Sequence, residues 1–386
     1  MSSLVPEGWK AKKIGDFLIS LPKSKLPSSV SNETGYYNFY VCSHNVLKSF
    51  YNEMSLPAVL FSTGGEAAVH YAIGKYSYST DVWAINFKDE IYNEYAFRVF
   101  DASLEKINYS GFQGSGIKHL DKKFIKDLTF AIPPLPEQKK ILSILTSVDE
   151  VIENTQKQID KLQDLKKATM KELLTKGIGH TEFKDSELGR IPKSWEFKAL
   201  NEIVSIPNGQ VDPKIEPYAS MPHIGSGNII SWTGQIKDVQ TAYQSGQISG
   251  KYLFNVNHIL YSKVRPNLAK VCMPQFDGVC SADIYPLLPK KQISDKFIFQ
   301  YLLTEQFTKT ATEVSERTGM PKINRQDLSV IKLPVPPFKE QLEIAKIIES
   351  IDDAMSLKTK KLSQTQFLKK SFMQDLLTGK VRVSVN

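Results

Sequence analysis

Residues 133–175 read PPLPEQKKILSILTSVDEVIENTQKQIDKLQDLKKATMKELLT, and residues 336–378 read PPFKEQLEIAKIIESIDDAMSLKTKKLSQTQFLKKSFMQDLLT. The two stretches align without a gap at an offset of 203, and 17 of their 43 positions are identical. A shorter repeat opens each half of the chain, where VPEGW at 5–9 matches IPKSW at 191–195. The segments between these repeats have diverged. The sequence therefore predicts a duplicated scaffold that carries two different modules.

Both long repeats are predicted to be helices. Pro133 and Pro134 disfavour helix just upstream, whereas Pro136 suits a first turn, where its missing N–H costs nothing. Apolar residues then recur at alternating steps of four and three, which is the heptad pattern of a coiled coil. The predicted seam consists of Ile141, Leu145, Val148, Ile152, Ile159 and Leu162 in the first copy and of Ile344, Ile348, Ile351, Met355 and Leu362 in the second. Beyond Leu162 the predicted stripe shifts through Leu165, Thr169 and Leu173.

One such helix cannot bury its apolar stripe alone, so we expect the two copies to pair as an antiparallel coiled coil. An antiparallel pair would relate the two modules by an approximate two-fold axis. The alternative is a helix that packs flat on its own module. Gly177 and Gly379 are expected near the C-terminal ends of the two helices.

The predicted fold class is α+β, with two similar α/β modules separated by the two long helices and related by the internal repeat. Residues 1–132 form the first module, 133–176 the first helix, 177–190 a polar linker, 191–335 the second module, and 336–386 the second helix with a C-terminal tail. Within the modules, strand-like runs at Tyr37–Val41, Ala58–Phe61 and His258–Tyr261 alternate with loops rich in Gly, Ser, Asn and Pro. Residues 295–316 are expected to be helical.

Composition is that of a globular chain, with 41% hydrophobic and 23% charged residues among 386. No apolar run is long enough to span a membrane, and the first residues lack the apolar core of a secretory signal. Three cysteines cannot form a disulfide framework, so a reducing, cytoplasmic location is expected. The formal net charge is +8, and because each long helix contributes +1, the remaining +6 lies outside the helices. This excess of positive charge favours a polyanionic partner.

The sequence offers little enzyme chemistry. No Cys or His cluster has zinc-ligand spacing, and neither a P-loop nor a dinucleotide-binding glycine motif is present, so no metal and no catalytic residue is predicted. Ile132-Pro133-Pro134-Leu135 is similar to the tetrapeptide of amino-methyltransferases, but it lacks both the Asn or Asp that would hold the target amine and the stacking aromatic. These absences argue against an autonomous enzyme, although a metal-free hydrolase built from scattered acidic residues remains an alternative.

With its repeats in place, the sequence resembles the specificity subunit of type I DNA restriction–modification systems. The resemblance is carried by Ile191-Pro192-x-x-Trp195 at the start of a half, by Pro133–Gln138 at a helix entry, and by Leu173-Leu174-Thr175 at a helix end. The central junction LLTKGIGHTEFKDSELGRIPKSW and the C-terminal LLTGKVRV also match the family pattern, and the resemblance covers the whole chain. One departure is Phe338-Lys339, which stands where the first copy has Leu135-Pro136.

The resemblance implies that the modules are target-recognition domains, each reading one half of a bipartite, asymmetric site on double-stranded DNA. It also implies that the helices act as a spacer and dock two methyltransferase subunits, which motor-endonuclease subunits then join. The chain itself is expected to be non-catalytic and without a cofactor, with S-adenosylmethionine, ATP and Mg²⁺ held by partner subunits. Two alternatives remain: a coiled-coil adaptor that scaffolds two protein partners without DNA, and an enzyme with two related domains.

For DNA binding, Lys and Arg are expected to contact phosphates, whereas amide, hydroxyl and guanidinium groups are expected to read base edges. The candidates are Lys23, Lys25, Tyr37, Asn38, His44, Thr63, Lys75, Tyr76, Gln113 and Lys118 in the first module and Lys214, His223, Ser226, Asn228, Lys263, Arg265, Asn267, Arg317 and Lys322 in the second. Arg265 precedes Pro266 in an extended loop and is the leading candidate for a guanine contact. For every candidate the alternative is an ordinary solvated side chain. Asp81 and Asp283 are expected to be turn or cap residues rather than catalytic acids.

Overall fold

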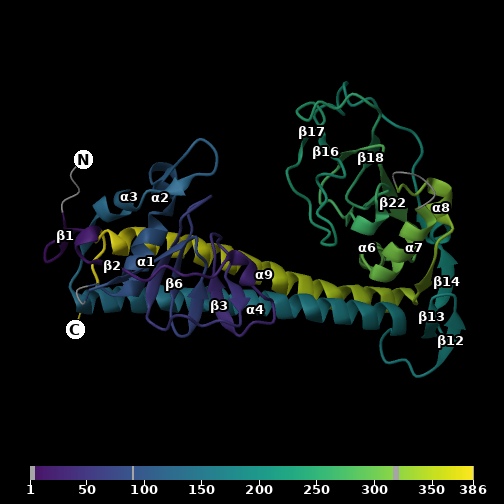
Figure 1. Ribbon diagram of the computed structural model, residues 1–386. Coiled ribbons are helices and arrows are strands. Elements are labelled where there is room, and N and C mark those ends of the chain that lie inside the picture. The colour runs from purple at the N-terminus through teal and green to yellow at the C-terminus, as the bar shows by residue number, and fades with distance from the viewer. Residues whose placement is uncertain (1–4, 89–90, 316–320, 386) are drawn as a thin grey trace. The chain divides into compact units, whose positions relative to one another are not determined.

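The computed structural model describes residues 5–88, 91–315 and 321–385, and the chain divides into two compact units. The first unit combines Met1–Lys157 with Lys358–Asn386, and the second is Gln158–Leu357. Each unit therefore contains one end of the long helix α4 (Leu135–Lys176) and one end of the long helix α9 (Phe338–Leu377). The N- and C-terminal segments of the chain both belong to the first unit (Figure 1).

The first unit is built on a four-stranded sheet of order β2-β8-β5-β6 and a three-stranded sheet of order β4-β3-β7, with the strand pairs β1-β11 and β9-β10 beside them. Its strands are β1 Lys10–Lys13, β2 Leu18–Ser20, β3 Tyr37–Tyr40, β4 Leu47–Ser49, β5 Ala58–Ser62, β6 Val69–Ala72, β7 Tyr76–Tyr78, β8 Val82–Phe87, β9 Phe112–Gln113, β10 His119–Leu120 and β11 Thr129–Ile132. Its short helices are α1 Asn93–Ala102, α2 Leu104–Ser110 and α3 Lys122–Asp127. Strand β5 is buried along its whole length because it lies between β6 and β8.

The second unit repeats this layout with sheets of order β15-β22-β19-β20 and β17-β16-β21-β18, the pair β14-β23 and the hairpin β12-β13. Its strands are β12 Phe183–Ser186, β13 Gly189–Pro192, β14 Glu196–Ala199, β15 Val204–Ser205, β16 Pro222–Ile224, β17 Gln240–Thr241, β18 Tyr252–Phe254, β19 Ile259–Ser262, β20 Val271–Cys272, β21 Gly278–Cys280, β22 Ile284–Pro289 and β23 Lys332–Val335. Its short helices are α5 Leu200–Ile203, α6 Asp295–Leu302, α7 Glu305–Ser315 and α8 Arg325–Ser329. In each unit one sheet contains a parallel pair, β3 with β7 in the first unit and β16 with β21 in the second.

The predicted strands are confirmed as β3, β5 and β19, within one residue at their ends. The expected helical stretch at 295–316 is two helices, α6 and α7, and its last residue lies outside the described part of the chain. The helix is interrupted before Glu305 because the hydroxyl of Thr304 accepts the N–H of Phe307 at 3.2 Å and caps a new helix. The segment expected to be a linker contains β12 and the start of β13.

The long helices begin and end where the sequence predicts. α4 begins directly after Pro133-Pro134 and ends one residue before Gly177, whose φ of +70° is an ordinary conformation for glycine. All predicted seam residues are buried or half-buried. Leu165 is a correction, since it is 51% exposed, and the buried stripe passes through Met170 and Leu174 instead. Within the described residues no helix is long and apolar enough to cross a membrane.

In each unit the two helix ends run antiparallel. In the first unit Glu137 pairs with Arg382 and Asp149 with Lys369, so partners recede along the chain as α4 advances. In the second unit the Nζ of Lys166 lies 2.7 Å from Asp352 Oδ1. The Asp149–Lys369 and Asp352–Lys166 pairs join the same two repeat positions with the helices exchanged. The predicted antiparallel pairing is therefore confirmed inside each unit.

The helices also pack on the modules, as the alternative interpretation had it. Ile141 and Leu145 of α4 join Trp9 and Phe87 in the core of the first unit, together with Leu376 of α9. The equivalent Ile344 and Ile348 of α9 join the core of the second unit with Leu174 of α4. Each helix end thus uses one apolar face against its helical partner and against the sheet module.

Candidate nucleic-acid interface

Each module is fixed to its helix by the tryptophan and glutamate of the two repeats. The indole N–H of Trp9 donates to Glu137 Oε2 at 2.9 Å, and that of Trp195 donates to Glu340 Oε2 at 3.0 Å. Glu137 also accepts Nε and Nη2 of Arg382 at 2.7 and 2.9 Å. Because each indole N–H is buried and its acceptor is a charged carboxylate, each bond fixes the helix start against its module.

The glutamine that follows this glutamate makes a second repeated link. Oε1 of Gln138 accepts the backbone N–H of Tyr92 at 3.0 Å, and Oε1 of Gln341 accepts that of Ser294 at 2.8 Å. Tyr92 and Ser294 occupy the N-cap positions of α1 and α6, so equivalent helices are held in equivalent places. The identical residues of the repeats therefore serve the scaffold and leave the loops of the modules free to differ.

In the first unit several loops meet at one edge, which we call the first loop edge (residues 41–46, 62–66, 79–81 and 113–120). Thr63 donates its N–H to the carbonyl of Asp81 at 3.0 Å, and Gly65 donates its N–H to the carbonyl of Lys118 at 2.9 Å. The thiol of Cys42 donates to the same Asp81 carbonyl. The loops joined in this way carry four predicted DNA-binding residues, namely His44, Thr63, Gln113 and Lys118.

The second unit has the corresponding second loop edge (residues 224–228, 262–270, 281–283 and 321–323). Lys263 donates its N–H to the carbonyl of Asp283 at 2.9 Å, and Arg265 donates its N–H to the carbonyl of Pro321 at 2.8 Å. Nζ of Lys270 donates to the carbonyl of Ser226 at 2.6 Å. These contacts bring together five predicted residues, namely Ser226, Lys263, Arg265, Asn267 and Lys322.

The two loop edges share their backbone and differ in their side chains. The bond from Gly65 to Lys118 corresponds to the bond from Arg265 to Pro321, and the acceptors stand at the same 203-residue offset as the helices. Isolated β-bridges repeat the match, Gly64 with His119 and Val264 with Lys322. A common frame thus presents glycines in one unit and bulky or cationic residues in the other.

Asp283 organises the cations of the second loop edge. Its Oδ1 lies 2.9 Å from Nζ of Lys322 and 3.7 Å from Nζ of Lys263, whose amine also lies 5.2 Å from the centre of the Tyr285 ring. The hydrogen bond and positive charge of Lys322 hold the pKa of Asp283 below its ordinary value. A carboxylate held ionised between two amines positions them and is a poor proton donor.

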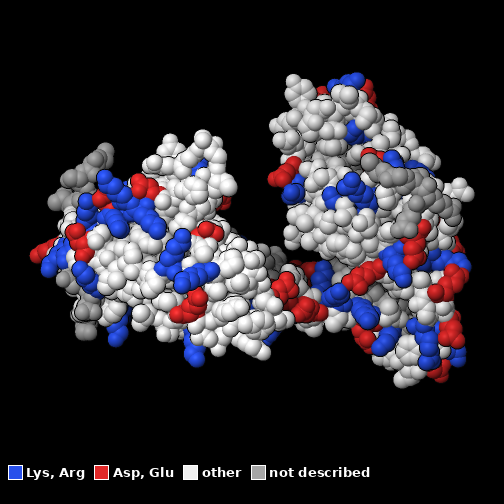
Figure 2. Space-filling view, viewed as in Figure 1, with Lys and Arg blue, Asp and Glu red and all other residues white. Residues whose placement is uncertain are grey.

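A basic cluster that the sequence reasoning missed lies at α3 in the first unit. Nζ of Lys122 lies 5.2 Å from the centre of the Trp83 ring. Burial, followed by repulsion from Lys23 and Lys126, lowers the pKa of Lys122. Figure 2 shows basic side chains gathered over this helix. The sequence signal for this cluster was the presence of three lysines within DKKFIKD (residues 121–127). Lys270 was also not predicted as a DNA-binding residue, although it lies five residues after Arg265.

The structure corrects three candidates. Tyr76 is buried and donates its hydroxyl to the carbonyl of Leu56 at 2.7 Å. His223 is buried too, and burial next to the charge of Lys251 lowers its pKa to about 4. The side-chain amide of Asn228 accepts from Gly225 and donates to two backbone carbonyls, so it holds its own loop. None of the three side chains is free to read a base in this conformation.

Other candidates lie apart from the loop edges or near them. Tyr37 and Asn38 lie at the start of β3, where Asn38 Oδ1 accepts Nζ of Lys48 at 2.9 Å, and Lys75 follows the end of β6 that lies away from Thr63. Lys25 adjoins Leu26, which bridges to Ser79 at the first loop edge. Lys214 is exposed in the loop after Val211, and Arg317 lies outside the described residues.

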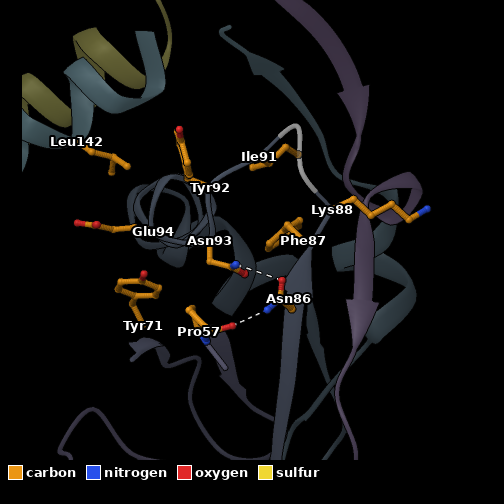
Figure 3. Close-up of a pocket in the computed structure, with 10 residues that line it drawn as sticks. All are labelled: Pro57, Tyr71, Asn86, Phe87, Lys88, Ile91, Tyr92, Asn93, Glu94 and Leu142. Atoms are coloured by element: carbon orange, nitrogen blue, oxygen red, sulfur yellow. Dashed lines mark hydrogen bonds between the residues drawn. The ribbon is translucent and has the colours of Figure 1, made fainter. Parts of the chain in front are cut away.

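Figure 3 shows a pocket of about 410 Å³ that is lined by Pro57 and Phe87. These residues lie at the ends of β5 and β8 that are opposite to the first loop edge. Its polar wall is a chain of amides, in which Asn93 Nδ2 donates to Asn86 Oδ1 at 3.2 Å and Asn86 Nδ2 donates to the carbonyl of Pro57 at 2.7 Å. Its carboxylate, Glu94, already meets Arg98 and Thr146. The pocket is thus remote from the predicted DNA residues of its unit. Among the described residues, no group of three or more His, Cys, Asp or Glu side chains could hold a metal ion.

Comparison with known proteins gives one family. The family model described as "Type I restriction modification DNA specificity domain" matches residues 6–164 and 192–365. The type I restriction enzyme EcoDI specificity subunit of Escherichia coli is 30% identical over 370 residues, which cover 90% of this chain and 82% of that protein. The MjaVIII specificity subunit of Methanocaldococcus jannaschii is 30% identical over 411 residues, covering 98% and 94%. Among solved structures, the type I S subunit from M. genitalium shares the fold, with a TM-score of 0.66 at 16% identity and 96% of each chain covered.

Proposed function

We propose, for a chain that belongs to the family of type I restriction–modification DNA specificity subunits, that it reads a bipartite, asymmetric target on double-stranded DNA, one half with each unit. As a specificity subunit it is the component that recognises a DNA sequence, and it is not catalytic. The bipartite division and the choice of partners are the proposed part.

The observation that carries the proposal is the pair of loop edges. Both are held by the same backbone hydrogen bonds, yet Gly65 and His119 stand where Arg265 and Lys322 stand. Sequence is read by side chains on base edges, whereas a common backbone sets only how those side chains are presented. One frame with two side-chain sets therefore favours two different half-sites and an asymmetric target.

Within the loop edges, cations supply affinity and polar groups supply selectivity. We assign phosphate contacts to Lys23, Lys118 and Lys122 in the first unit and to Lys263, Lys270 and Lys322 in the second, because all lie at or beside the loop edges. Base contacts are assigned to the polar side chains His44, Thr63, Gln113, Ser226 and Asn267. The +6 charge outside the long helices supports this arrangement.

The long helices offer surfaces for protein partners. In the first unit Phe367 is 77% exposed beside the exposed Leu368, and in the second unit Leu357 is 70% exposed. Large apolar side chains exposed on a helix are typical of an interaction surface. We therefore assign one methyltransferase subunit to each unit, with motor-endonuclease subunits joining that complex. S-adenosylmethionine, ATP and Mg²⁺ would be bound by those partners.

Module exchange tests the DNA proposal. Residues 10–115 of the chain are replaced by the matching part of a relative with a known target, and the modified bases of host DNA are mapped by single-molecule sequencing. One half of the target should change while the other half stays. A target that changes in both halves, or only in affinity, would exclude the division of labour between the units. A complex that retains its partners but binds no DNA would instead support the adaptor alternative.

Co-purification tests the partner proposal. Phe367→Asp and Leu357→Asp should each remove one methyltransferase subunit from the complex, because a charge replaces an apolar contact. The neighbouring polar positions serve as matched controls in Gln366→Asp and Ser356→Asp, which should leave two subunits bound. Full occupancy in both apolar variants would exclude these surfaces as docking sites.

A further inference from the structure

The backbone at Arg265 is in a conformation that side chains rarely adopt. Its φ is +51°, and the nearby Trp232 and Ala269 also have positive φ values, of 66° and 42°. Trp232 donates its N–H to the carbonyl of Ala269, and Ala269 donates its own N–H to the carbonyl of Pro266, the residue after Arg265. Such a conformation costs energy in any residue with a Cβ atom, and it persists where the surroundings impose it, often at functional sites.

The first unit has a glycine at the equivalent position of this turn. Gly65 occupies the position equivalent to Arg265, has a φ of +81°, and would have open space around an added Cβ atom. Glycine adopts this conformation without strain. The turn itself therefore does not require arginine, and a role for Arg265 must lie in its side chain.

The guanidinium of Arg265 differs from the other arginines that the structure describes. Arg98 and Arg382 bind carboxylates, Arg325 donates to three oxygens of the 206–208 segment, and Arg190 lies over the Phe183 ring. Across residues 5–88, 91–315 and 321–385, Arg265 alone has an arginine side chain with no hydrogen bond, carboxylate or ring partner. It is exposed and held at its base by a 2.8 Å bond from its N–H to Pro321.

The surroundings favour contact with a base edge. A hollow of about 230 Å³ lies beside the side chain, lined by Ser226, Val264, Arg265, Leu268 and Lys270. The carbonyl of Arg265 accepts the N–H of Leu268 at 2.9 Å, so the turn is closed on both sides. Lys263, Lys270 and Lys322 supply positive charge around it, so a phosphate contact does not need a guanidinium in a strained turn. A planar donor pair in a fixed place is instead what recognition of one particular base requires.

We propose that Arg265 reads a guanine in the half-site of the second unit, with two parallel N–H donors directed at O6 and N7 in the major groove. The first unit has no counterpart at this position, because Gly65 has no side chain. This inference rests on the proposed function, and it adds the base, the residue and the unit.

Arg265→Gly is the decisive variant, because it copies the first unit and relieves the backbone strain. Folding is controlled by a melting temperature that should be no lower than that of the parent chain. The control is Arg190→Ala, which removes an exposed guanidinium outside the loop edge. Alanine is used there because glycine would disturb β13. Arg265→Lys keeps the charge but loses the paired donors. All are assayed in the complex with the methyltransferase partner.

The readout is binding to a panel of duplexes, each with one base pair of the mapped target changed, together with the map of modified bases in cells. The half read by the second unit is identified as the half that survives exchange of residues 10–115. Arg265→Gly and Arg265→Lys should lower affinity for the parent target by about 5- to 150-fold and make one G·C pair of that half degenerate. Arg190→Ala should change neither.

An unchanged target, a change in the other half, or equal weakening on every duplex would overturn the assignment. If Arg265→Gly weakened binding equally on every duplex while Arg265→Lys bound almost normally, Arg265 would be identified as a phosphate contact instead. A parent complex with no bipartite target would reject the proposed function itself, and that result is visible before any variant is made.

Discussion

Replacing Glu137 by Gln should weaken the attachment of the first module to α4. Glu137 is 3% exposed and receives the indole N–H of Trp9, which is 6% exposed, together with two donors from Arg382. A hydrogen bond to a charged group contributes about 1.5–3 kcal/mol. The Arg382 side chain is 43% exposed, so solvent screening limits its share to about 0–1 kcal/mol. Glutamine keeps a neutral acceptor, whose hydrogen bond contributes about 0.5–1.5 kcal/mol, so the expected loss is about 1–2.5 kcal/mol, or roughly 2–10 °C in melting temperature for a unit of this size.

A double-mutant cycle separates the tryptophan bond from the rest. Trp9→Phe keeps an aromatic ring in the core but has no N–H to donate, so the bond is absent in both Trp9→Phe and the double variant. Glutamine still accepts the Trp9 N–H through a neutral oxygen, so the coupling energy between Trp9→Phe and Glu137→Gln measures the charge-assisted part of the bond and should be about 1–1.5 kcal/mol. Trp195→Phe and Glu340→Gln form the matched cycle in the second unit, where Glu340 accepts the Trp195 indole at 3.0 Å.

Hydrogen exchange followed by mass spectrometry is the appropriate assay, because a chain of two units need not unfold in one step. Glu137→Gln should lower protection at the start of α4 and at the end of α9, both of which belong to the first unit. Protection around Trp195 should not change. Additivity within about 0.5 kcal/mol in the first cycle would refute the bond as an energetic link.

Three further changes test other parts of the structure. Burial next to Lys251 lowers the pKa of His223 to about 4, below its value near 6.5 in the unfolded chain, so the unfolded state binds more protons between these values. The stability that neutral His223 contributes is then complete above about pH 6.5 and is lost as pH falls toward 4. His223→Phe should flatten the dependence of the unfolding free energy on pH in this window, as measured by urea titration at several pH values. An unaltered dependence on pH would contradict this prediction. Gly177→Ala should lower the free energy of unfolding by more than about 2 kcal/mol, because an added Cβ would collide with the Glu340 carboxylate and the Trp195 ring at a φ of +70°. Its control, Gly179→Ala, has a φ of +68° and open space, and should cost about 1 kcal/mol. Equal losses in chemical denaturation would show that the collision is relieved. The slope of log K against log salt for DNA binding should fall by about 0.9 in Lys118→Ala and stay constant in Lys75→Ala, which lies away from the loop edge; equal slopes in both variants would remove Lys118 from the phosphate contacts.

The helices and the duplication could be predicted from sequence because their signals are local. Pro133-Pro134, the heptad steps and Gly177 each act within a few residues, and a constant offset needs no structure to be seen. The roles of Glu137 and Gln138 could not be predicted, since their partners Trp9 and Tyr92 are distant in sequence. The repeat marked these residues as important without indicating what they bind.

The interface residues were predictable only in part, because exposure depends on the sheets. Tyr76 lies in β7, where every residue is buried. The strand therefore has no alternation of buried and exposed residues from which the burial of Tyr76 could be predicted. Asn228 has the amide expected of a base reader, but a loop closed by its own side chain uses that amide completely. The pKa of Lys122 is lowered first by burial and then by Lys23, which is far away in the sequence. Arg265 was singled out by its proline neighbour, and its left-handed backbone became visible only in three dimensions.

The first unit combines segments from before and after the second unit, so it cannot be completed until the second unit has been made. Its core needs Met373, Leu376 and Leu377, which follow Trp9 and Ile141 only after the whole second unit has been translated. At about 5–20 residues per second, the intervening 200 or so residues take roughly 10–40 s. The second unit is contiguous and can close during that interval. Nascent chains should therefore present the unsatisfied apolar face of α4 to chaperones on the ribosome, and the emergence of α9 should be the event that buries it.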